Sequence, residues 1–123
     1  MTDQTHRFSC WAALSGVLGA SAVAIGAIAA HAVTHPVAIA SIERASAYQL
    51  WHTLAILVSL FLKGTAPVIA RIMFLVGICL FCGSIYSKYL MNISEAVVVA
   101  PLGGAAFMAG WLVLGFSGYQ SIK

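Results

Sequence analysis

Charged side chains are scarce in this sequence: only 7% of its 123 residues are Asp, Glu, Lys or Arg. Soluble domains carry about 25% charged residues. Apolar residues make up 62% of the chain instead. Six basic and three acidic side chains cannot cover a particle of this size in water. The composition therefore excludes a soluble globular domain and indicates that the outer surface contacts a lipid bilayer.

Several functional motifs are also missing. The basic residues form no run, so the net charge of +3 does not indicate a nucleic-acid partner. The sequence contains no hydrolytic triad, phosphate-binding loop or paired-carboxylate pattern, and no Cys-x-x-Cys-His for covalent haem attachment. We therefore expect a protein that is not an enzyme and that holds no cofactor.

Long apolar stretches are the main positive feature. A spanning helix needs about 20 mostly apolar residues, and the predicted spans cover residues 8–33, 42–62, 66–90 and 94–119. Upstream of the second span, helical spacing continues back to Pro36, which predicts amphipathic first turns at the membrane surface. Short connections favour antiparallel neighbours. The predicted fold is all-α: one transmembrane domain over residues 1–123, an integral membrane four-helix bundle with antiparallel up-down connections.

Basic residues near the span ends predict the orientation. The side that holds both termini carries Arg7, Lys63, Arg71 and Lys123, and the other side carries Arg44 and Lys88. The positive-inside bias then predicts cytoplasmic N- and C-termini. Ala30-His31-Ala32 imitates a secretory cleavage site, but the apolar run before it is longer than the 7–15 residues of a signal. We expect this run to remain as the first span.

Small residues predict where the helices pack. Burying leucine does not drive association in lipid, whereas small residues allow close backbone approach. The first span repeats this spacing at Ala22, Gly26 and Ala30, so we expect it to be the tightly packed centre of the bundle. Gly83 and Ser84 are further packing positions in the third span. In the fourth span, Pro101 with Gly103 and Gly104 predicts a kink or a short unwound turn.

Four segments in order resemble a known family. They are Gly26-Ala27-Ile28-Ala29-Ala30-His31, Tyr48-Gln49-Leu50-Trp51-His52, Leu80-Phe81-Cys82-Gly83-Ser84-Ile85-Tyr86, and Pro101-Leu102-Gly103-Gly104 followed by Gly110-Trp111. The chain resembles the small bacterial inner-membrane proteins typified by YgdD and YwdK, which are related to eukaryotic transmembrane protein 256. The resemblance implies a bacterial cytoplasmic (inner) membrane location and no assigned substrate, cofactor or reaction. Ala29 and Cys82 depart from the glycine and serine that are usual there.

His31, Tyr48 and His52 form the candidate polar site. Ionisable groups inside a membrane are functional candidates by default. A proton relay, half of a metal site and a ligand anchor are all open; the alternative is a buried bond between helices, such as His52 to a carbonyl of the first span. We favour this alternative because polar residues often join spans. Zinc usually needs four ligands, and few other residues that could ligate it lie near these histidines, so we expect no metal.

Cys79 and Cys82 form a Cys-x-x-Cys pattern inside the third span. That spacing supports redox exchange where a thiolate is stabilised, but apolar surroundings suppress the reactivity of thiols. We interpret both cysteines as small hydrophobic residues.

Three classes of function remain open. The favoured one is a helix-packing accessory or structural protein that binds another membrane protein or itself. The first alternative is an oligomeric transporter or channel for a small solute or protons, motivated by the predicted break between Pro101 and Gly104. The second alternative is a membrane redox protein that binds a cofactor through His31, His52, Tyr48 or the cysteines.

Overall fold

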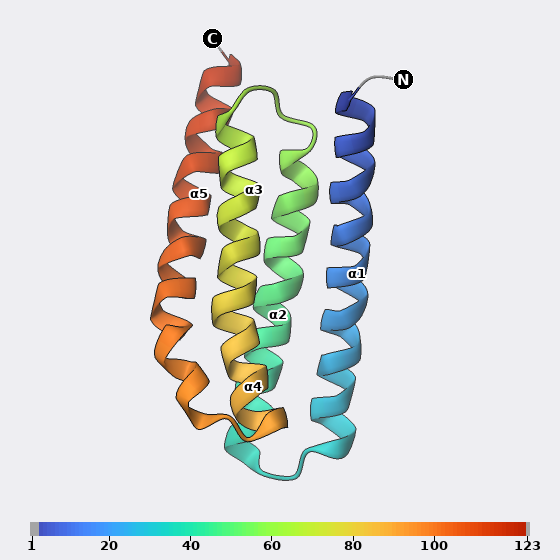
Figure 1. Cartoon of the computed structure of the whole chain (residues 1–123), viewed down its shortest axis with the longest axis vertical. Helices are drawn as coiled ribbons and strands as arrows, with labels where there is room; N and C mark the ends of the chain where they lie inside the picture. The colour runs from blue at the N-terminus through green and yellow to red at the C-terminus, as the bar shows by residue number, and fades with distance from the viewer. Residues whose placement is uncertain (1–2, 123) are drawn as a thin grey trace.

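The computed structural model describes residues 3–122, and these residues form helices and connections with no strand. The elements follow in the order α1 (Asp3–Ala32), α2 (Pro36–Ser59), α3 (Ala66–Gly77), the π-helical η1 (Ile78–Cys82), α4 (Gly83–Met91), the 3-10 helical η2 (Ser94–Val99) and α5 (Ala100–Ile122). The α3–η1–α4 run is one continuous helical column (Figure 1). The predicted all-α class is confirmed.

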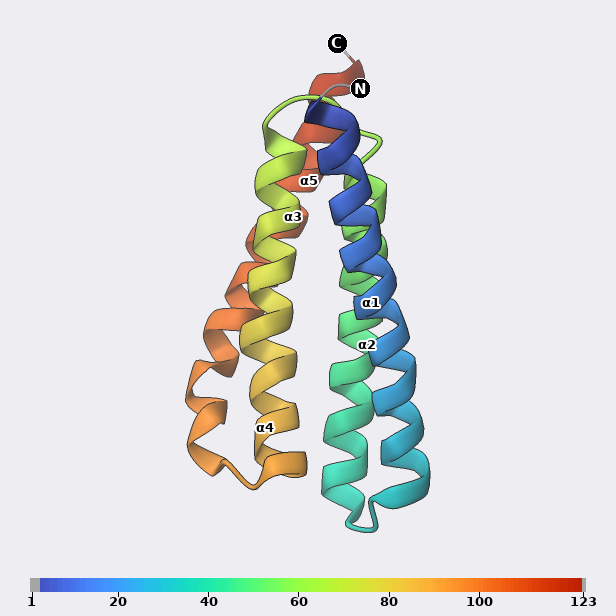
Figure 2. The same cartoon turned by 45° about the vertical axis from the view of Figure 1, so that its right-hand side comes forward.

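The long helices lie side by side (Figures 1 and 2). α1 begins and α5 ends at the same end of the molecule, where the α2–α3 connection also lies. α1 packs mainly on α2, α5 packs mainly on α3, and contacts between α2 and α3 join these two pairs. Figure 2 shows the pairs diverging toward the opposite end. α2 and α3 are therefore the inner helices of the arrangement.

α2 begins at Pro36, as the sequence predicts, and continues without interruption to Ser59. Proline fits a first turn because its missing N–H would have no partner there. Three helical stretches are long and apolar enough to cross a membrane, namely Thr5–Ala32, Ala66–Met91 and Ser94–Tyr119. α2 does not meet this criterion among the described residues, because polar side chains interrupt it, including Gln49, His52 and Thr53. These same side chains are buried against neighbouring helices.

The expectation that the first span is the tightly packed centre is wrong. α1 contacts its neighbours through Ser15, Ala22 and Ala29, which are buried at a seven-residue spacing. A Cβ atom at Gly16 or Gly19 would meet nothing within 4 Å. These two glycines therefore make no close packing contact with another helix of the chain. Gly26 is the exception, since its Cβ would lie 3.4 Å from Ser46 Oγ.

Close backbone approach occurs instead between α5 and the column formed by α3 and η1. A methyl group at Gly77 would overlap the Phe107 ring, and one at Gly103 would overlap the Phe81 backbone and lie 2.8 Å from its Cβ. A Cβ at Gly110 would lie 2.7 Å from Cε1 of Phe74. Glycine is required at these positions because an aromatic side chain or a backbone segment occupies the space. Gly104, by contrast, faces open space.

Two irregular turns adjust the helices. The π-helical turn Ile78–Cys82 was not predicted; there the Gly83 N–H bonds back to the Ile78 carbonyl. The kink or unwound turn predicted near Pro101 does not lie between Pro101 and Gly104, since α5 is regular from Ala100. The irregularity precedes the proline as the 3-10 helix η2, in which the Ala100 N–H bonds to the Val97 carbonyl. Pro101 therefore occupies a first turn, where its missing N–H is tolerated.

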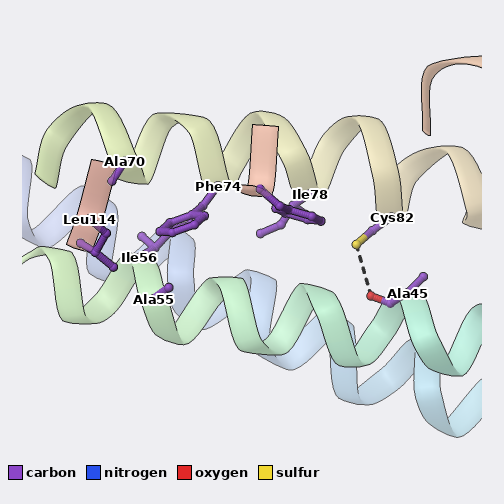
Figure 3. Close-up of a cluster of buried hydrophobic side chains, with 9 residues drawn as sticks. Ala45, Ala55, Ile56, Ala70, Phe74, Ile78, Cys82 and Leu114 are labelled. Atoms are coloured by element: carbon purple, nitrogen blue, oxygen red, sulfur yellow. Dashed lines mark hydrogen bonds between the residues drawn. The ribbon is translucent and has the colours of Figure 1, made fainter. Parts of the chain in front are cut away.

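A hydrophobic cluster joins α2, α3, η1 and α5 (Figure 3). Phe74 and Ile56 lie at its centre and are completely buried. At one edge, the Sγ atom of Cys82 donates to the Ala45 carbonyl over 3.2 Å, shown as the dashed line in Figure 3. Cys82 thus packs as a buried small residue, and it also contacts α2 through a weak hydrogen bond.

Candidate functional site

The candidate site lies midway along α2, where Gln49 and His52 project toward different neighbours. Both side chains are buried, with exposed fractions of 3% and 6%. Polar side chains are costly to bury in lipid unless their hydrogen bonds are satisfied. Among the described residues, every buried side-chain nitrogen and oxygen has a hydrogen-bond partner. The site is therefore a fully bonded polar centre.

Both ring nitrogens of His52 are occupied. Nδ1 lies 2.6 Å from the Tyr48 carbonyl, and the Trp111 indole N–H donates to Nε2 over 3.0 Å. A carbonyl can only accept a hydrogen bond and an indole can only donate one. The geometry therefore requires a neutral imidazole with its proton on Nδ1. In this state His52 joins α2 to α5.

Aromatic rings enclose the imidazole. The Phe107 ring stacks on His52 with centroids 3.6 Å apart and an interplanar angle of 16°. Phe74 and Trp111 approach at centroid distances of 5.5 and 5.9 Å. Tyr48 stacks in turn on Phe81, at 5.2 Å. These contacts fix the orientation of the imidazole, and they surround it with apolar surface.

A groove of about 410 Å³ runs along this cluster between α2 and α5. Its lining residues are Tyr48, Trp51, His52, Gly104, Phe107, Met108 and Trp111. Trp51, Met108 and Trp111 are about half exposed or more, so the groove opens on the outer surface. It offers apolar contact to a lipid chain. Since both nitrogens of His52 are already bonded, the lining provides no free acid–base nitrogen there.

Gln49 links three helices. Its Nε2 donates to the Leu18 carbonyl over 2.8 Å and to Ser21 Oγ over 2.7 Å, both on α1. Its Oε1 accepts from the Tyr86 hydroxyl of α4 over 2.8 Å. The Thr53 hydroxyl donates to the Gln49 backbone carbonyl at 2.6 Å. Sequence reasoning missed this role, although a lone amide within an apolar stretch was a visible signal.

The structure brings together only part of the predicted site. Tyr48 and His52 are adjacent, and the interpretation of His52 as a link between helices agrees with its observed bond, although the partner is Trp111 of α5. His31 is exposed at the end of α1. His52 lies about 24 Å along α2 from Pro36, at about 1.5 Å per residue, whereas His31 immediately precedes the α1–α2 connection. The two histidines therefore do not meet.

The two cysteines of η1 lie in different environments. Cys79 is exposed and Cys82 is buried, and both are free thiols. Both belong to the π-helical turn, whose wider spacing separates their faces. Among the described residues, no three His, Cys, Asp or Glu side chains lie close enough to hold a metal ion.

The all-helical fold, the apolar helices of spanning length and the internally bonded polar centre define a helical integral membrane protein. Residues 25–104 match the family model described as "Protein of unknown function (DUF423)". The chain belongs to this family, which confirms the resemblance seen in the sequence. No solved structure matches the chain.

Similar proteins cover most of the chain. A "UPF0382 membrane protein" of Haemophilus influenzae is 32% identical over 94% of this chain and 96% of its own length. The "UPF0382 inner membrane protein YgdD" of Escherichia coli K12 is 33% identical over 89% of this chain and 88% of its own length. A "UPF0382 membrane protein" of Staphylococcus aureus is 33% identical over 76% of this chain and 81% of its own length. These names describe a membrane location and assign no activity.

Proposed function

We propose that this chain is an accessory protein of the bacterial inner membrane that binds another membrane protein, or a second copy of itself, and has no enzymatic turnover. The observation that carries the proposal is that every buried side-chain nitrogen and oxygen of the described residues is hydrogen-bonded inside the chain. The side chain of Gln49 hydrogen-bonds to α1 and α4, and that of His52 hydrogen-bonds to α5 and to the Tyr48 carbonyl of α2 itself. A transported ion or a reacting substrate would need polar groups that are free to bind it.

The proposed topology is an antiparallel four-helix bundle with both termini in the cytoplasm. Supporting it, α1 begins and α5 ends at one end of the molecule, together with Arg7, Lys63 and Arg71. The positive-inside bias places such an end in the cytoplasm. Although α2 is the least apolar of the long helices, its buried polar groups are shielded by α1, α4 and α5. Reporter fusions after residue 34 and at the C-terminus test the topology, with a periplasmic signal expected only from the first.

The proposed binding surface is the part of α1 around Gly16 and Gly19. A Cβ atom at either glycine would meet nothing within 4 Å, and Val17 and Val23 nearby are about two-thirds exposed. A partner helix can approach closely at such glycines, which allows van der Waals contact between the backbones.

Mild detergent extraction of the tagged chain from its native membrane tests the proposal. We expect a stoichiometric partner or homo-oligomer, identified by mass spectrometry, that is lost when Gly16 and Gly19 are both replaced by Leu. Gly115→Leu is the matched control, because Gly115 on α5 also faces open space. It should retain the complex, and all variants should unfold at the same temperature. A wild-type chain that elutes as a lone monomer contradicts the proposal.

The transporter alternative loses the observation that motivated it, since the segment from Pro101 to Gly104 is regular helix. The redox alternative gains no support from the cysteines, which do not face each other as a pair. The accessory role is the function that agrees with the bonded state of the polar centre.

A further inference from the structure

A second cavity, of about 520 Å³, lies at the end of the molecule where α1 begins. Its wall is formed by the first turns of α1, by the α2–α3 connection and by the start of α3. Each of these segments contributes one basic side chain: Arg7, Lys63 and Arg71. No acidic residue is among the lining residues. The cavity is therefore cationic on three sides.

One of the three cations is held in place. The Arg71 Nη2 donates to the Ser59 carbonyl over 3.0 Å, and its guanidinium lies 5.7 Å from the centre of the Trp11 ring. Arg7 is close enough for its charge to act unfavourably on Arg71. Like charges that face one cavity are stabilised when an anion binds between them. A guanidinium with a fixed orientation is also suited to a phosphate, since its N–H groups match phosphate oxygens.

The remaining wall is apolar. Phe8, Trp11, Leu62 and Val68 line it, and the Phe8 ring packs edge-on against Phe61 with centroids 5.8 Å apart. Trp and basic residues gather at the level of the lipid headgroups in membrane proteins. A ligand that satisfies both walls has a phosphate at one end and hydrocarbon at the other. A soluble phosphate would satisfy only the cationic wall.

We propose that this cavity binds a phosphate anion, and that in the membrane the phosphate belongs to the headgroup of an anionic phospholipid. Arg71 is the anchored donor, Arg7 and Lys63 add charge from the two flanking segments, and Phe8 and Trp11 contact the first part of an acyl chain. Basic pockets between helix ends on the cytoplasmic side are suited to such headgroups. A bound lipid would also link α1 to the α2–α3 connection.

Thermal unfolding of the purified full chain in a neutral detergent tests this site. Phosphatidylglycerol, phosphatidylcholine and inorganic phosphate are titrated separately, because a ligand that binds only the folded state raises the unfolding temperature. The test variant is Arg7→Gln with Lys63→Gln, which leaves the anchored Arg71 in place. Arg44→Gln with Lys88→Gln is the matched control, since it removes the same charge from the opposite end of the helices.

We expect phosphatidylglycerol to raise the unfolding temperature, with phosphatidylcholine giving little change. The test variant should weaken the apparent affinity for phosphatidylglycerol roughly tenfold or more, since each basic residue contributes appreciably to binding an anionic headgroup. The control should stay within about twofold of wild type. Equal losses in both variants, or equal stabilisation by phosphatidylcholine, overturn the site. Stabilisation by inorganic phosphate alone, without any effect of the lipid, overturns the assignment to a headgroup.

Discussion

The indole N–H of Trp111 donates to Nε2 of His52 at 3.0 Å, and so joins α5 to α2. The bond is possible only because the other nitrogen of His52 donates to the Tyr48 carbonyl on its own helix. The local helical contact thus selects the tautomer that the contact between helices needs. This coupling explains how a titratable residue is held within an apolar protein without a charge.

Replacing Trp111 with Phe should destabilise the chain by about 1 kcal/mol. The phenyl ring keeps contact with Phe74 but leaves Nε2 of buried His52 without a donor. Reversible denaturation in a mixed micelle measures the loss. Trp51→Phe is the matched control, because Trp51 is 55% exposed and lines the same groove. A similar loss in both variants would show that aromatic volume, and not the hydrogen bond, sets the stability.

The tautomer of His52 is open to direct observation. In a sample labelled with ¹⁵N at histidine, Nε2 of His52 should resonate at neutral pH as an unprotonated ring nitrogen, and Nδ1 as a protonated one. In Trp111→Phe the preference for protonated Nδ1 should weaken. A doubly protonated His52 at neutral pH would contradict the bond with Trp111.

Two adjacent glycines on α5 should respond in opposite ways to replacement by alanine. Gly103→Ala should destabilise the chain by about 1–3 kcal/mol, because the added methyl group overlaps the backbone of Phe81. Gly104→Ala should be neutral or slightly stabilising, since its Cβ meets open space and alanine favours helix. Thermal unfolding of the two variants side by side gives the comparison. If Gly104→Ala cost as much as Gly103→Ala, the contact between α5 and η1 would be wrongly placed.

The sequence was sufficient for the class of the fold and for the start of α2 at Pro36, because apolar length and a proline in a first turn are local signals. It was misleading about α1, whose regular small residues suggested a central helix. Small residues show where close approach is possible, but the aromatic rings that fill the space come from distant segments. Phe81 and Phe107 determine which glycines matter, and sequence spacing alone does not pair them with Gly103 and Gly77.

The polar site was predictable only where its signals are local. His52 was identified because a titratable side chain is costly to hold in a membrane, and four-residue spacing placed Tyr48 beside it. Its true partner, Trp111, lies 59 positions away, and sequence spacing alone does not pair the two residues. The π-helical turn was also unpredicted, since no proline or glycine pair marks it within Ile78–Cys82. These features depend on pairings between helices, which one sequence does not display.

The amide of Gln49 should be coupled energetically to the Tyr86 hydroxyl. Tyr86→Phe removes one donor and leaves Oε1 of buried Gln49 unpaired, so we expect a loss of about 1 kcal/mol. Gln49→Leu also removes the bonds to Leu18 and Ser21, and should cost more. In the double variant the total loss should be smaller than the sum, because the bond between the two side chains can be lost only once.

A double-mutant cycle by reversible denaturation measures this coupling, for which we expect about 0.6–1.7 kcal/mol, the range found for bonds between membrane helices. The control cycle pairs Gln49→Leu with Trp111→Phe. Trp111 bonds to His52 and not to Gln49, so these two losses should add within about 0.5 kcal/mol. Additivity in the first cycle would mean that the Gln49 side chain stabilises the contact with α1 but not the contact with α4. Coupling there, with additivity in the control, would make Gln49 the residue through which α2 holds α1 and α4 together.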